Sequence, residues 1–359
     1  MSDDQAQLCE VRPMHRFDEA VLREYLADQI PGANQTMSVQ QFQGGQSNPT
    51  FLLTTPKGRF VMRKKPPGKL LPSAHLVERE YRVMRALEST GVPVPHTRLL
   101  CEDPSIIGTT FFVMDHVEGR ILERPELDYA GMTPAERREL YMTMTDTLGT
   151  LHNVDVAEVG LSDFGKPQDY YARQIGRWSK QYEASCEPPA GGEEGALAMR
   201  KLMAWLPANI PADEASGIAH GDFRIGNLII DPQLPRVAAV LDWELSTLGH
   251  PLGDLAYCCI PYHLPAGMNE VKGLRGLDLE ALGIPSEEDV LARYCDITGR
   301  NGIADWPFYV SFALFRLAAI LQGVYSRALM GNASSANALI VGERAGLLAE
   351  TGWRIANGD

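Results

Sequence analysis

The sequence lacks the cysteine patterns that mark metal sites. Its six cysteines include no CxxC pair, and the adjacent Cys258 and Cys259 are a poor start for a metal site. We therefore expect reduced, mostly buried thiols, as in cytosolic proteins. The first residues also lack the basic and apolar regions of a secretory signal. These absences together predict a cytoplasmic protein.

Positive charge and long apolar runs are scarce as well. The 359 residues hold 33 Lys and Arg against 46 Asp and Glu, a formal net charge of −13. This balance argues against a nucleic-acid or anionic-membrane surface, because both favour basic proteins. The most apolar stretch, 308–324, is interrupted by Arg316 and is expected to be a buried helix rather than a membrane span. The length suits two domains, or two lobes around one cleft.

Hydrophobic patterning divides the chain into a β-rich part and a helical part. Four short apolar segments with turn residues between them predict strands at 39–42, 51–54, 60–63 and 111–114. Helical spacing predicts helices at 17–30 and 74–90. From there on helices dominate, apart from two short strands at 228–230 and 237–241. The expected fold class is α+β, with a small sheet-containing lobe at 1–116 and a larger, mainly helical lobe at 117–359.

The segment His220-Gly221-Asp222-Phe223-Arg224-Ile225-Gly226-Asn227 carries the clearest chemical pattern. Phosphoryl transfer to an alcohol needs a carboxylate near the attacking hydroxyl and oxygen ligands for Mg²⁺. Asp222 and Asn227 can supply both from one loop, and the hairpin that follows returns Asp242 to that loop. An isolated Asp and Asn pair would more simply stabilise a turn. The position of Asp242 favours the chemical interpretation.

This ordered pattern resembles the aminoglycoside phosphotransferase and choline kinase branch of the protein-kinase-like fold. A closer similarity is to the kinase-like domain associated with acyl-CoA dehydrogenases, carried also by the stretches 44–50, 61–68 and 242–251. The resemblance implies a two-lobed phosphotransferase that uses ATP and Mg²⁺.

The resemblance also implies roles for individual side chains. Asp222 would be the catalytic base or would orient the acceptor hydroxyl, while Asn227 and Asp242 would hold Mg²⁺. Asp254 would support the catalytic loop from the next helix, and His220 is expected to brace the loop backbone.

The turn at 44–50 resembles the loop that covers the nucleotide phosphates. Its glycines, including Gly45, let the backbone approach a ligand closely, and Ser47 and Asn48 can donate to phosphate oxygens. The segment fits neither GxGxxG nor the Walker pattern, so a plain hairpin turn is the alternative.

The strand at 60–63 ends in a run of basic residues. Kinases of this fold place a cation here and pair it with a Glu on the following helix. Because side chains alternate along a strand, Arg63 and Lys64 must point to opposite faces. We choose Arg63 as the phosphate ligand with Glu80 as its partner, and keep Lys64 as the alternative. Lys64 and Lys65 are otherwise expected on a solvated edge, with Glu78 facing solvent.

The segment 112–117 resembles the connector between lobes. Adenine would pair with backbone groups around Asp115 and Val117, and Met114 would form a wall of the pocket. A core strand leading into a turn is an equally compatible structure.

The acceptor is expected to be a small molecule. Asp-Trp-Glu replaces the DFG of protein kinases, no APE segment follows, and Asp242 and Asp254 are only twelve residues apart. Acceptor contacts are expected from the loops at 160–215 and from helices after 255, including Tyr262, His263 and Arg316. The family association suggests a hydroxyacyl-CoA or hydroxy acid, with an aminoglycoside or amino-alcohol kinase and a non-catalytic pseudokinase as alternatives. His152, His250 and His263 have no metal-ligand spacing.

Overall fold

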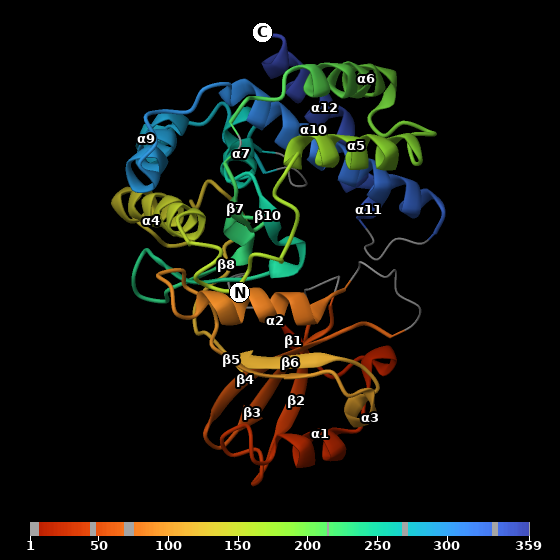
Figure 1. Cartoon of the computed structure of the whole chain (residues 1–359), viewed down its shortest axis with the longest axis vertical. Coiled ribbons are helices and arrows are strands. Elements are labelled where there is room, and N and C mark those ends of the chain that lie inside the picture. Colours follow the sequence, from red (N-terminus) through yellow and green to blue (C-terminus); the bar gives the residue numbers. More distant parts are fainter. Residues whose placement is uncertain are drawn as a thin grey trace. The chain divides into compact units, whose positions relative to one another are not determined.

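The computed structural model describes residues 7–43, 48–67, 75–213, 215–267, 272–331 and 337–358. Its internal contacts divide the chain into two compact units, which we call the sheet unit and the helical unit (Figure 1). The sheet unit comprises Met1–Leu122, Glu158–Leu161 and Gly226–Ser246. The helical unit comprises Glu123–Ala157, Ser162–Ile225 and Thr247–Asp359. The sheet unit therefore takes in the hairpin at 226–246, which the sequence places in the second lobe.

A six-stranded antiparallel sheet is the frame of the sheet unit, in the order β1-β2-β3-β4-β6-β5. Its strands are β1 (Leu8–Cys9), β2 (Ser38–Phe42), β3 (Thr50–Thr55), β4 (Gly58–Lys64), β5 (Thr97–Cys101) and β6 (Phe111–Asp115). The four strands predicted from alternation and turn residues are confirmed. The two edge strands, β1 and β5, were not predicted, because their assignment depends on hydrogen bonds to partners distant in sequence.

Helices cover both faces of this sheet. Alternation sends Phe111 of β6 towards α1 (Glu19–Leu26) and α3 (Pro104–Ile107), where it is fully buried. The next residue, Phe112, contacts Tyr81 of α2 (Val77–Leu87) on the opposite face. Figure 1 shows α2 on one side of the sheet and α1 and α3 on the other. Each fully buried Phe of this kind stabilises the unit by roughly 2–3 kcal/mol.

A short hairpin completes the sheet unit and carries Asp242. It is formed by β8 (Leu228–Ile230) and β9 (Val237–Val240), preceded by the 3-10 turn η2 (Ile225–Asn227) and followed by η3 (Trp243–Leu245). Arg120 and Ile230 exchange two backbone hydrogen bonds of 2.8 Å, which attach β8 to the rest of the unit. Gly119 permits this approach, since a Cβ there would lie 2.3 Å from the Ile230 carbonyl oxygen.

The helical unit contains the remaining helices and one small strand pair. Its helices are α4 (Pro134–His152), α5 (Tyr170–Glu183), α6 (Gly192–Ala208), α7 (Leu252–His263), α8 (Leu279–Leu282), α9 (Glu287–Thr298), α10 (Trp306–Leu329), α11 (Ala338–Gly342) and α12 (Ala345–Ala356). The strands β7 (Gly217–Ala219) and β10 (Thr247–Gly249) pair antiparallel, and in sequence they come before and after the segment 220–246. At the start of α4, Thr133 and Glu136 form the reciprocal hydrogen bonds of a capping box.

The helix expected around Arg316 is α10, the longest in the described part of the chain. By length and composition alone its 24 residues could cross a membrane, but 67% of its most apolar window is buried inside the protein. It packs against α5, α6, α7, α11 and α12. The apolar run at 308–324 is therefore explained by core packing, as predicted.

Candidate active site

A guanidinium bridges two carboxylates on the α2 face of the sheet. Arg63 of β4 places Nη1 3.1 Å from Glu80 Oε2 of α2 and Nη2 3.3 Å from Asp242 Oδ1, just after β9. The Glu80 side chain is 1% exposed and that of Arg63 is 11% exposed, whereas Asp242 is 36% exposed. The predicted pairing of Arg63 with Glu80 is confirmed. Its role towards phosphates stays a prediction.

Burial sets the electrostatics of this cluster. It raises the pKa of Glu80 to about 7, against the opposing effect of the Arg63 cation. Burial also disfavours the Arg63 cation, but the carboxylates of Glu80, Asp242 and Glu244 outweigh it and raise the pKa of Arg63. The guanidinium therefore stays charged among three acidic side chains.

The side chain of Asn48 is hydrogen-bonded to acidic residues of this cluster. It is fully buried, and its amide nitrogen donates to Glu80 Oε1 at 2.8 Å and to Glu244 Oε2 at 3.3 Å. Its oxygen lies 3.1 Å from Nδ1 of His75. Both amide hydrogens are thus used, so the predicted donation from this side chain to a phosphate does not fit the observed contacts. Gly45 and Ser47, the other predicted loop ligands, lie outside the described residues.

Lys64 and Lys65 were expected on a solvated edge, but the structure places them differently. Lys64 is 4% exposed on the face opposite Arg63, with its amine 5.8 Å from the Phe17 ring centre and 6.0 Å from that of Phe51. Burial lowers its pKa. Lys65 is paired with Glu78 at 2.8 Å, so neither of these is a free surface charge. Of the two candidate cations, Arg63 is the one that faces Glu80 and Asp242, and its contact with phosphates stays a prediction.

Asp242 and Asn227 offer hard oxygen donors of the kind that Mg²⁺ prefers. Asp242 has φ 66° and ψ 58°, a left-handed conformation that is uncommon for a residue with a Cβ and is frequent at functional sites. The Asn227 backbone oxygen accepts a 2.8 Å hydrogen bond from Leu241, directly before Asp242. The described residues contain no group of three or more His, Cys, Asp or Glu placed to hold a metal. A carboxylate and an amide oxygen still suit Mg²⁺, which usually keeps waters and takes other ligands from substrate phosphates.

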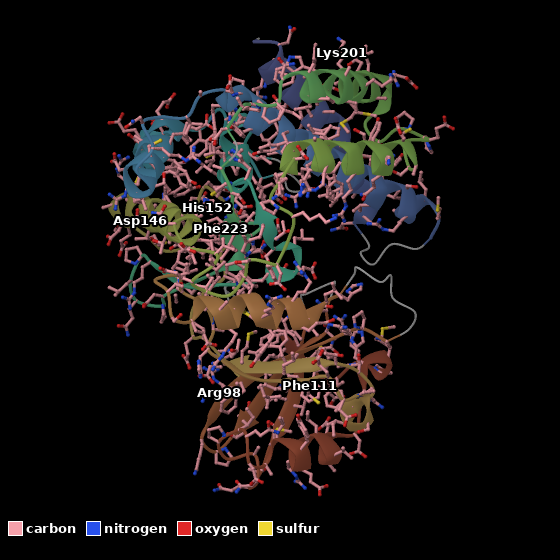
Figure 2. The ribbon with its side chains drawn as sticks, in the orientation of Figure 1. Arg98, Phe111, Asp146, His152, Lys201 and Phe223 are labelled. Carbon is pink, nitrogen blue, oxygen red and sulfur yellow. The ribbon has the colours of Figure 1, made fainter. Side chains whose placement is uncertain are left out.

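The loop that carries Asp222 is fixed from below by Asp254. This carboxylate is 3% exposed and accepts backbone hydrogen bonds from His220 at 2.6 Å and from Gly221 at 2.8 Å. His152 lies 3.4 Å from it, in the interior of the helical unit (Figure 2). Burial alone would raise the pKa of Asp254, but the hydrogen bond and charge of His152, the charge of His220 and the backbone hydrogen bond from Gly221 outweigh it and hold the pKa below its ordinary value. His220 in turn accepts from the Asp222 backbone at 3.1 Å, which supports the predicted bracing role.

Aromatic and basic side chains surround Asp222 within the helical unit. Arg316 donates to the Gly221 carbonyl oxygen at 2.7 Å, and its guanidinium lies over the rings of Trp178 and Tyr257 at 5.7 and 5.9 Å. The Tyr257 hydroxyl is hydrogen-bonded to Asp222, and burial raises the pKa of Tyr257. Arg224 Nε lies 3.7 Å from Asp222 Oδ2.

Two other predicted acceptor contacts have structural partners instead. Tyr262 donates to the Pro285 carbonyl oxygen at 3.0 Å, and His263 Nε2 lies 2.8 Å from Glu287. These contacts join α7 to the start of α9. Of the three candidates, Arg316 alone has a described contact with the catalytic loop.

The connector residues are placed by β6. Met114 is 6% exposed, and Asp115 forms a two-point ion pair with Arg98, at 2.6 and 2.8 Å. The Asp115 backbone N–H donates to the His96 carbonyl oxygen at 2.8 Å. The pairing of adenine with Asp115 or Val117 stays a prediction.

A known protein family matches the part of the chain that carries this site. The model of the phosphotransferase enzyme family matches residues 38–288, a range that contains Arg63, Glu80, Asp222, Asn227 and Asp242. The chain belongs to this family.

Curated relatives of the chain carry another name. Acyl-CoA dehydrogenase family member 10 of Mus musculus is 44% identical over 349 residues, covering 96% of this chain and 32% of the relative. Acyl-CoA dehydrogenase family member 11 of Homo sapiens is 41% identical over 358 residues, covering 98% of this chain and 45% of the relative. The chain thus spans less than half the length of these relatives.

Solved structures agree on the fold. A proposed aminoglycoside phosphotransferase from Ralstonia eutropha JMP134 is 46% identical, with a TM-score of 0.86 and coverage of 96% of this chain and 99% of that one. Choline kinase from Cryptosporidium parvum is 12% identical, with a TM-score of 0.64 over 93% of this chain and 95% of that one. Spectinomycin phosphotransferase, solved with ADP and spectinomycin, is 11% identical, with a TM-score of 0.63 over 96% and 99%. The chain therefore has a kinase-like α+β fold.

Several partners in this candidate site were not predicted from the sequence. Glu244 and His75 complete the contacts of Asn48, and Trp178 and Tyr257 flank Arg316. Glu244 had a usable signal, because it lies two residues after Asp242 in Asp-Trp-Glu. The others come from segments with no motif, so sequence spacing could not place them.

Proposed function

We propose that this chain transfers the γ-phosphoryl group of ATP to a hydroxyl group of a small molecule that also carries an acidic group. The observation that carries the proposal is the Arg63 bridge between Glu80 and Asp242, at 3.1 and 3.3 Å. It sets a permanent cation beside a half-exposed carboxylate, and these are the two group types that a nucleotide triphosphate and its metal require.

Asn227 and Asp242 would hold Mg²⁺, and their oxygen donors fit that ion. When bound, the metal neutralises charge on the phosphate oxygens. Arg63 would bind those oxygens through its planar guanidinium. The Asn48 side chain, occupied by Glu80 and Glu244, would act only by holding these groups.

Asp222 would orient the acceptor hydroxyl and take its proton as the oxygen–phosphorus bond forms. Asp254 holds the backbone of His220 and Gly221 in place, and this fixes the position of the Asp222 backbone. The hydrogen bond from Tyr257 adds a second restraint on the Asp222 carboxylate.

Two cations near Asp222 favour an acidic acceptor. Arg224 is 45% exposed and lies 3.7 Å from Asp222, and Arg316 contacts the Gly221 carbonyl oxygen. Guanidinium groups bind carboxylates and phosphates well and oppose cationic amines. The acyl-CoA dehydrogenase names of the relatives suit the same class, so we place hydroxy acids and hydroxyacyl-CoAs ahead of aminoglycosides and amino alcohols. All six cysteines are free thiols, which suits a reducing cytoplasm.

The test is a screen for ATP-dependent gain of one phosphoryl group by mass spectrometry. Hydroxy acids, hydroxyacyl-CoAs, amino alcohols and aminoglycosides are each incubated with the protein, ATP and Mg²⁺. We expect turnover of an acidic acceptor, and loss of about 10³-fold or more in kcat for Asp222→Asn. The control is Asp128→Asn, an exposed carboxylate paired with Arg124 in the helical unit, which should keep full activity.

Three results would contradict the proposal. Turnover of amino compounds alone would overturn the acceptor class, and unchanged turnover by Asp222→Asn would overturn its role. Nucleotide binding without transfer to any acceptor would favour a non-catalytic pseudokinase.

A further inference from the structure

Three segments of the sheet unit meet at the Asn48 side chain. Asn48 lies just before β3. Its side-chain amide donates hydrogen bonds to Glu80 of α2 and to Glu244 of η3. His75, just before α2, faces its oxygen. Because that oxygen accepts only, Nδ1 of His75 must carry the hydrogen. Both hydrogens and the oxygen of this buried amide therefore have a contact.

These contacts close into a ring. Arg63 joins Glu80 to Asp242, and Asn48 joins Glu80 to Glu244. The chain itself completes the circuit, because Asp242 and Glu244 are two residues apart in one turn. We call this set, Asn48, Arg63, Glu80, Asp242 and Glu244, the Asn48 ring.

Asp242 is the ring member whose backbone most needs support. Its left-handed conformation, φ 66° and ψ 58°, persists only where flanking contacts impose it. On one side Leu241 donates to the Asn227 carbonyl oxygen at 2.8 Å. On the other side, the side chain of Glu244 accepts from Asn48. The second contact is made by a residue with no assigned role.

We propose that Glu244 and Asn48 are positioning residues that hold Asp242 in place for Mg²⁺ and nucleotide binding, with Glu244 acting through its hydrogen bond from Asn48. The inference rests on the proposed function, since it concerns the same site. This role can be distinguished from direct binding of the metal by Glu244. Accepting a hydrogen bond from Asn48 requires an oxygen but no charge.

The same contacts explain why a neutral amide is required at position 48. Glu80 and Glu244 both accept from it, so the position requires two hydrogens between two carboxylates. An aspartate has the same shape but no hydrogens to donate when ionised, and it would add a third negative charge. Asn48→Asp therefore breaks the ring without changing side-chain volume.

The test measures binding of a non-hydrolysable ATP analogue by titration calorimetry, at several Mg²⁺ concentrations. Removing an orienting partner of a metal ligand typically weakens metal affinity 10–100-fold, so Glu244→Ala should raise the Mg²⁺-dependent Kd about tenfold or more. Glu244→Gln keeps an oxygen that accepts from Asn48 and should stay within about threefold of the wild type. Asn48→Asp should bind at least as weakly as Glu244→Ala.

The matched control is Glu78→Gln on α2, a partly exposed carboxylate paired with Lys65, which should leave the Kd unchanged. Thermal unfolding identifies any variant that fails to fold, and the pair Glu244→Gln and Asn48→Asp then decides the question, since both conserve shape.

Two results would overturn the inference alone. One is wild-type affinity in Glu244→Ala or in Asn48→Asp. The other is equal weakening by Glu244→Gln and Glu244→Ala, which would make Glu244 a charge-dependent ligand. A wild-type protein that binds no Mg²⁺ and nucleotide would instead overturn the proposed function, and this inference with it.

Discussion

At the scale of single residues, two neighbouring cations on β4 have opposite surroundings. The register pairs Arg63 with Phe112 and Lys64 with Phe111, so the two side chains leave the sheet on different faces. Arg63 meets Glu80 and Asp242. Lys64 meets aromatic rings, and no carboxylate lies within ion-pair distance of its amine in the described part of the chain. The positive charge is therefore paired with carboxylates at position 63, whereas burial disfavours it at position 64.

We expect Lys64→Met to keep activity and to hold or raise stability. Methionine fills a similar volume without a desolvated charge, and replacing buried charges by apolar groups often stabilises a protein, here by about 1 kcal/mol once the lost contacts with Phe17 and Phe51 are offset. Urea unfolding monitored by circular dichroism gives the change. A clear loss of stability would show that the buried amine stabilises the fold and would contradict this expectation.

The matched substitution, Arg63→Met, should act in the opposite direction. It leaves Glu80 buried without its cation, which costs roughly 3 kcal/mol when a buried pair is broken. Nucleotide binding should weaken at the same time. Equal stability of the two methionine variants would contradict the assignment of the two faces.

At the scale of elements, the first turn of α7 holds the loop that carries Asp222. Asp254 lies in that turn and accepts from the backbone of His220 and Gly221, which follow β7. The helix N-terminus further favours its negative charge. The loop is thus positioned by an adjacent helix rather than by its own turn residues.

Asp254→Asn should loosen that attachment. An amide offers one accepting oxygen where the carboxylate offers two, so one loop N–H loses its partner and stability should fall by roughly 2–4 kcal/mol. Because the folded pKa of Asp254 lies below its unfolded value, its contribution is present above about pH 4 and is lost as the pH falls through the folded value.

Unfolding curves from pH 7 to pH 2 measure this change. The difference between Asp254→Asn and the wild type should shrink towards the acid end. A constant difference over that range would contradict the ionised carboxylate.

At the scale of the whole molecule, buried neutral histidine sets part of the acid sensitivity. Burial lowers the pKa of His250 to about 4, although Asp213 opposes the shift, while Arg300 adds to it. The ring is stacked on Tyr309, with centroids 5.3 Å apart. The buried position therefore disfavours protonation of His250 in the folded protein.

The sign of the pH effect follows from the lowered pKa. The contribution of His250 is fully present above its unfolded value of about 6.5 and is lost as the pH falls to about 4, by up to roughly 3 kcal/mol. His250→Gln should flatten the stability profile over this window, and His96→Gln on the surface is the control. Equal slopes for the wild type and His250→Gln would contradict a buried neutral ring.

Local signals predicted much of the fold. Apolar alternation and turn residues located β2, β3, β4 and β6. Each of these strands has a buried face, and its apolar residues are visible as a pattern in the sequence. The capping box at Thr133 fixed the start of α4. The helices predicted at 17–30 and 74–90 are shorter, Glu19–Leu26 and Val77–Leu87, since apolar spacing continues past the last helical hydrogen bonds.

The sequence alone determined the family, the order of the site motifs and the ion pair of Arg63 with Glu80, because each depends on residue type and spacing along one segment. Tertiary structure alone decided the burial of Lys64, the commitment of Asn48 to two carboxylates and the place of Arg316 between Trp178 and Tyr257. The physical reason is that burial and hydrogen-bond partners depend on segments distant in sequence. The residues next to a side chain in sequence do not indicate which distant carboxylate or aromatic ring it will contact.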